Sequence, residues 1–106
     1  MKKTFFLLSV FFFFSAPTWA EQPKGNPEAG KQKATLCFSC HGQNGIAVLP
    51  IYPNLAGQNR EYLDIAVKAY REGGERSKNP IMPAMIKPLS DVDMADIVAY
   101  FSGLKK

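Results

Sequence analysis

The sequence has few of the residues from which polar reactive sites are built. Its 106 residues include one His, two Cys and one Trp. A structural zinc site needs four ligands, and the three soft ligands present are crowded within five positions of the chain. The longest apolar run has about 10 residues, whereas a membrane-spanning helix takes about 20. These shortages argue against a zinc site and against a membrane span.

The N-terminus has the composition of a secretory signal peptide. Two Lys precede an apolar run over residues 5–14, and small residues occupy the end of the segment before an acidic residue, Glu21. We therefore predict that residues 1–20 are cleaved, that residues 21–106 form one domain in the periplasm of a bacterium, and that no stable membrane insertion remains. After cleavage the chain contains 11 Lys and Arg and 9 Asp and Glu, because two of the 13 basic residues are removed. This small excess gives no reason to expect a nucleic acid partner.

Three segments of the mature chain are predicted to be helical. The first runs from Pro27 into Cys37, the second ends at Gly73, and the third covers the end of the chain with Met94 on its apolar face. Each helix follows a side chain that can cap its free N–H groups. These three side chains are Asn26, Asn59 and Ser90, the last with Asp93 as partner in a capping box.

Two long irregular segments, residues 42–58 and 75–89, separate the predicted helices. A chain this short buries little apolar surface, so it needs a disulfide, a metal or a large apolar cofactor to stabilise it. Long loops in a small domain are often wrapped around such a group.

The two Cys, at positions 37 and 40, are followed at once by the single His, His41. This spacing is typical of c-type haem attachment, in which both thiols add to the porphyrin vinyl groups and the imidazole binds the iron. A thioredoxin-like pair would need a surrounding βαβ sheet, for which the helical pattern leaves no room. A plain disulfide would close too short a loop to stabilise the chain much, and it leaves His41 unexplained.

The chain resembles the class I cytochromes c, in particular the small bacterial monohaem type whose domain also occurs doubled in dihaem periplasmic carriers. The resemblance extends over nearly all of the mature chain. The residues that show the resemblance are Gly30, the Cys37–His41 motif with Gly42, and residues 50–58, 79–82, 89–91 and 96–101. It implies an all-α small cytochrome c fold, with three main helices and long loops wrapped around one covalently attached haem c.

The resemblance also implies roles for individual residues. Cys37 and Cys40 would form the thioethers, and His41 would bind the iron. Met82 would be the opposite ligand because it lies seven residues before the apolar residue that precedes the Ser cap, with Met85 as the alternative. In similar cytochromes a backbone carbonyl accepts a hydrogen bond from the other ring nitrogen of the His, and its place here is Pro50.

Closed His and Met ligation is the chemistry of an electron carrier and not of an enzyme. We therefore expect a protein that shuttles single electrons between redox partner proteins. One alternative is the haem subunit of a larger dehydrogenase, such as a flavocytochrome with a flavoprotein subunit. A ligand sensor or peroxidase with a labile iron site is a further alternative. Candidates for steering a partner are the basic residues Lys31, Lys33, Lys78 and Lys87.

Overall fold

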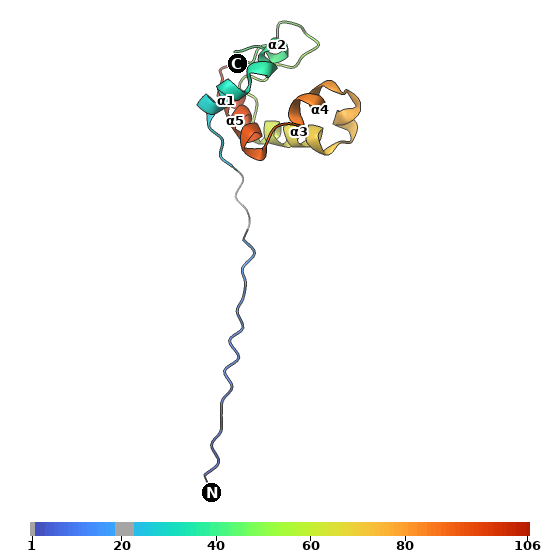
Figure 1. The fold of residues 1–106 in the computed structure, drawn as a ribbon. Coiled ribbons are helices and arrows are strands. Elements are labelled where there is room, and N and C mark those ends of the chain that lie inside the picture. The colour runs from blue at the N-terminus through green and yellow to red at the C-terminus, as the bar shows by residue number, and fades with distance from the viewer. Residues whose placement is uncertain (1, 19–22) are drawn as a thin grey trace.

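The computed structural model describes residues 2–18 and 23–106. Residues 2–18 have no regular secondary structure and extend away from the folded domain (Figure 1). The predicted cleavage point after Ala20 lies outside the described residues. Within the described part of the chain no helix is long and apolar enough to cross a membrane.

The described residues of the domain form helices and no strand, which confirms the all-α fold class. Figure 1 shows α1 and α5 together, α2 at one end of the domain, and α3 beside α4 at the other. In chain order the elements are α1 (Pro27–Lys33), a 3₁₀ turn η1 (Thr35–Cys37), α2 (Phe38–His41), α3 (Arg60–Glu72), a 3₁₀ turn η2 (Glu75–Lys78), α4 (Ile81–Ile86) and α5 (Asp91–Ser102).

The prediction of one continuous helix from Pro27 into Cys37 is wrong. The helix begins as expected, with the Asn26 side chain accepting the first free N–H groups. The Ala34 N–H still bonds the Gly30 carbonyl at 2.8 Å, but the Cys37 N–H bonds the carbonyl of Ala34, only three residues back. This tighter pattern ends α1, so the attachment motif lies on a separate short turn and helix.

The other two predicted helices are confirmed at their caps. The Asn59 side chain accepts the Tyr62 N–H at 2.9 Å, and both bonds of the Ser90 and Asp93 capping box are present. Gly73 ends α3 with a φ of +96°, a conformation that side chains rarely adopt. The segment 75–89, expected to be irregular, instead contains η2 and α4.

The core is built where α1 crosses α5. A Cβ added at Gly30 would lie 1.9 Å from the Asp96 carbonyl oxygen, so the two helices can approach only because residue 30 has no side chain. The close approach lies at Asp96, one helical turn before Tyr100. Every residue from Met94 to Phe101 is buried, so α5 is surrounded by the rest of the domain.

A buried carboxylate fastens the same crossing. Asp96 accepts hydrogen bonds from Lys33 Nζ and from the Asn26 N–H, each at 2.7 Å. The bond from Lys33 is the main cause that lowers the pKa of Asp96. Lys33 also lies 2.8 Å from Asp93, and that contact helps to lower the pKa of Asp93 to about 2. Lys33 therefore has a structural role, which makes it a poor candidate for steering a partner.

Candidate functional site

The attachment motif lies against the core at the junction of η1 and α2. Both thiols are free and half-buried, although their spacing would permit a disulfide. Cys37 and Phe38 pack against the core cluster that includes Phe101. Burial, with a smaller effect from Cys40, raises the pKa of the Cys37 thiol, so at neutral pH it is kept protonated.

The imidazole of His41 is held in one tautomer. The residue is only 7% exposed, and its Nδ1 lies 2.9 Å from the backbone carbonyl oxygen of Pro53. Because a carbonyl can only accept, Nδ1 must carry the proton, and the lone pair of the neutral ring is then on Nε2. An imidazole prepared in this way can bind a metal through Nε2.

The expectation that Pro50 supplies this carbonyl is wrong. A turn in which the Tyr52 N–H bonds the Leu49 carbonyl at 3.1 Å reverses the chain at this point, and Pro50 lies exposed on it. The carbonyl that reaches the ring is three residues further on, at Pro53. Both prolines lie within one segment of the family resemblance, so the sequence indicates the segment and not the residue.

Sequence reasoning also missed Tyr52, which lies against both parts of the motif. Its ring centroid is 6.4 Å from that of His41, in an edge-on arrangement. A hydrogen bond with Cys40 is the main cause that raises the pKa of the Tyr52 hydroxyl. Tyr52 and Pro53 therefore border His41 from the loop side, one through its ring and the other through its carbonyl.

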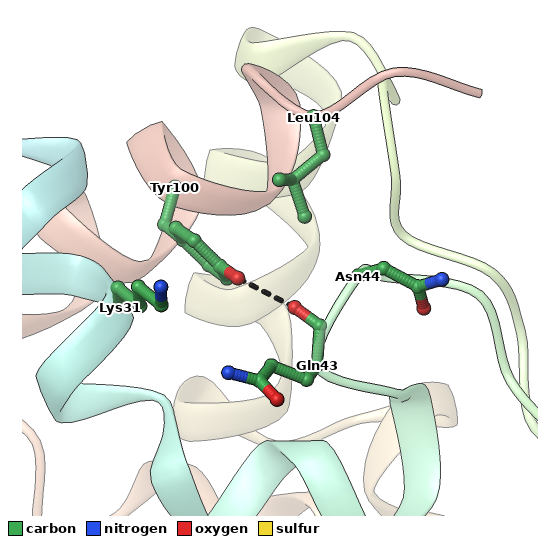
Figure 2. Close-up of a pocket in the computed structure, with 5 residues that line it drawn as sticks. All are labelled: Lys31, Gln43, Asn44, Tyr100 and Leu104. Atoms are coloured by element: carbon green, nitrogen blue, oxygen red, sulfur yellow. Dashed lines mark hydrogen bonds between the residues drawn. The ribbon is translucent and has the colours of Figure 1, made fainter.

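The chain that follows His41 is tied to α5. The Tyr100 hydroxyl donates a hydrogen bond to the Gln43 carbonyl across a hollow of about 430 Å³ (Figure 2). Lys31, Asn44 and Leu104 complete the lining. None of the motif residues lines this hollow, so it is distinct from the attachment site. The hydrogen bond across it anchors the loop that follows His41.

The two candidate methionine ligands lie on one short helix, α4. Met82 is half-buried and Met85 is 45% exposed, three residues apart and so on one face. The preference for Met82 stays a prediction. Met94, expected in the core, is 1% exposed, and its sulfur accepts a hydrogen bond from Arg71.

The residues present fit a haem. Two free thiols and an imidazole with Nε2 available are close together, which is the donor set for covalent attachment and iron binding. The segments 42–58 and 75–89 also carry large apolar side chains that are exposed, and exposed apolar surface of this kind marks a ligand-binding or interaction site. These side chains are Ile46, Val48, Leu49, Ile51, Ile81 and Met85.

Comparisons with known proteins agree with this interpretation. The family model described as "Cytochrome c" matches residues 27–105. The chain is 47% identical over 80 residues to cytochrome c-554(548) of Halomonas halodenitrificans, covering 74% of this chain and 96% of that protein. It is 40% identical over 83 residues to cytochrome c4 of Thiocapsa roseopersicina, covering 77% of this chain but only 42% of the relative.

A third relative is the thiosulfate dehydrogenase electron acceptor of Thiomonas intermedia, 32% identical over 99 residues, with 92% of this chain and 41% of that protein covered. Among solved structures, reduced recombinant cytochrome c4 from Pseudomonas stutzeri matches with a TM-score of 0.68 and 38% identity. That match covers 76% of this chain and 46% of the other. The chain thus spans nearly all of one relative and less than half of the others.

Proposed function

Since the chain belongs to the cytochrome c family, whose members bind covalently attached haem c, we propose that it carries single electrons in the periplasm with His41 and Met82 as the iron ligands. The relatives are electron-carrier cytochromes and not enzymes. The observation that carries the proposal is the 2.9 Å contact between His41 Nδ1 and the Pro53 carbonyl, which leaves Nε2 free to bind iron.

Each residue of the site has a separate task in this proposal. The haem supplies the one-electron couple. Cys37 and Cys40 would hold the haem through thioether bonds, one S–H adding across each vinyl double bond. The Pro53 carbonyl keeps the imidazole of His41 in its binding orientation and makes it more basic. Met82 would supply a thioether sulfur as the second protein ligand of the iron, which would favour the reduced state.

Optical spectroscopy of the oxidised protein tests the methionine assignment. We expect Met82→Ala to lose the methionine-to-iron charge-transfer band and to bind carbon monoxide readily when reduced. Met85→Ala is the matched control, because it removes the same side chain from the same helix, and it should keep the band. If the two results are exchanged, Met85 is the ligand. If the wild-type protein lacks the band and binds carbon monoxide, the closed-carrier proposal is wrong.

We also propose that residues 1–20 are a cleaved signal peptide. Its support is the charge and apolar pattern of the N-terminus, together with the extended course of residues 2–18 away from the domain (Figure 1). The mass of the protein isolated from a periplasmic fraction tests this. It should equal residues 21–106 plus one haem, and a chain that retains residues 1–20 would contradict cleavage.

A second candidate is a haem subunit that receives electrons from a dehydrogenase. The observation in its favour is that a relative matching 92% of this chain is described as the electron acceptor of an enzyme. The partner would be a redox protein, either a transient donor or a permanent flavoprotein subunit. Purification from the native periplasm at low salt distinguishes these cases. A lone monomer supports the free carrier, and a flavoprotein in constant ratio supports the subunit.

A further inference from the structure

The segment between α3 and α5 carries both candidate methionines, and two arginines fasten it to its neighbours. We call residues 73–89 the methionine segment. The first fastening is at its N-terminal end, where the Arg76 guanidinium lies 5.9 Å from the ring centroid of Tyr62 and 5.6 Å from that of Tyr70. Its Nη2 also donates a hydrogen bond to the Tyr62 hydroxyl at 3.3 Å. One side chain thus spans two turns of α3.

The second fastening is at the C-terminal end of the segment. Arg71, near the end of α3, donates from Nη2 to the Leu89 carbonyl at 3.3 Å and to the Met94 sulfur at 3.1 Å. Its Nη1 lies 2.7 Å from Asp91 at the start of α5. The two arginines therefore hold opposite ends of the methionine segment.

Between these two points the Ser77 hydroxyl donates a hydrogen bond to the Tyr70 carbonyl at 3.5 Å, and few side chains of the segment are buried. Ile86 is the only residue of α4 that is buried, while Ile81 and Met85 are about half exposed. At the start of the segment Gly73 and Gly74 have φ values of +96° and +89°, and a Cβ at Gly74 would meet nothing within 4 Å. This is a hinge in open space, joined to a helix that has little apolar contact with the core.

We propose that Arg71 and Arg76 are positioning residues that decide how often the methionine segment opens away from α3, and thereby how firmly the methionine is held on the iron. The second part rests on the proposed function. Opening at the Gly73 and Gly74 hinge would carry Met82 and Met85 away together, because both lie on α4. The two arginines act through the segment, and neither forms a hydrogen bond with Met82 or Met85, the two candidate iron ligands.

Hydrogen exchange of the haem-loaded protein, followed by mass spectrometry of its peptides, tests the first part. Arg76→Gln removes the cation from both rings and should speed exchange in residues 75–86 roughly tenfold, as expected for losing two exposed cation–π contacts. Arg60→Gln is the matched control. Arg60 starts the same helix and has no hydrogen bond or ion pair with another described residue, so exchange should be unchanged. Arg76→Lys, which keeps the charge, should lie between the two.

The second readout concerns the iron ligand. Carbon monoxide should bind reduced Arg76→Gln roughly tenfold faster than wild type or Arg60→Gln. Arg71→Gln should speed exchange at the other end, in residues 86–89. A change in residues 75–86 no larger than in Arg60→Gln refutes the proposal.

The two proposals fail in different ways. If wild type lacks the methionine charge-transfer band, the assigned ligand is wrong, and hydrogen exchange alone then decides whether the arginines hold the segment. If the band is present and exchange is faster in Arg76→Gln but carbon monoxide binding is not, opening of the segment does not control the ligand, and that part of the inference is wrong.

Discussion

Gly30→Ala tests whether the crossing of α1 and α5 determines the stability of the domain. Two effects oppose each other. Alanine is favoured over glycine inside a helix by about 0.5–1 kcal/mol, and α1 is helical at residue 30. Against this, the new Cβ would lie 1.9 Å from the Asp96 carbonyl oxygen and 2.5 Å from its carbon, whereas real Cβ contacts stay beyond 3.0 Å. The helices must therefore move apart by about 1 Å, because both clashing atoms belong to backbone that cannot rotate away.

The clash should outweigh the gain in helix propensity. Overpacking of this kind costs about 1–3 kcal/mol, and separating the helices also stretches the bonds that Asp96 makes with Lys33 and Asn26. We expect the free energy of unfolding of the haem-loaded protein to fall by about 1–2 kcal/mol. With a urea slope of about 1–2 kcal/mol/M, the midpoint should fall by about 1 M.

Urea titration followed by far-ultraviolet circular dichroism measures this change. Gly103→Ala serves as the control, since its Cβ would lie 3.3 Å from the nearest atom outside its neighbours, the Ala99 carbonyl oxygen, and it should shift the midpoint by less than about 0.5 M. A Gly30→Ala protein as stable as wild type, or more stable, would show that helix propensity prevails and that the close crossing is not needed.

Three further predictions follow from contacts around the site. Asp93→Asn should make the stability of the domain depend less on pH in acid. The ionised carboxylate of Asp93 stabilises the fold above its unfolded pKa of 3.8, and this contribution is lost as the pH falls toward its folded pKa of about 2. The urea midpoints of wild type and variant should therefore converge as the pH falls over that range. Tyr100→Phe removes the bond to Gln43 and should cost about 1 kcal/mol in urea unfolding with the optical spectrum unchanged; an equal midpoint would mean that water replaces the bond without loss. Tyr52→Phe keeps the ring beside the imidazole, so in a redox titration it should shift the potential less than Tyr52→Ala, and the reverse order would assign the effect to the hydroxyl.

Local sequence signals were sufficient for several parts of the fold. The caps at Asn26, Asn59 and Ser90 are correct because each capping bond joins residues only two or three positions apart. The ends of α3 follow from equally local signals, the Asn59 cap and Gly73. The cysteine and histidine motif, which indicates the cofactor, likewise lies within five consecutive residues.

Contacts between distant residues decided the rest. Asp96 is joined to Lys33 and Asn26 across 63 and 70 positions, and no periodicity shows which carboxylate will be buried against which cation. Which carbonyl accepts the hydrogen bond from His41 depends on a turn of the chain at Pro50. Because of that turn the acceptor is Pro53 and not Pro50. The sequence by itself thus determined where α1, α3 and α5 begin and which cofactor is bound, because these depend on neighbouring residues. Only the tertiary structure decided how the imidazole is oriented and how the methionine segment is held, because those depend on atoms that folding brings together.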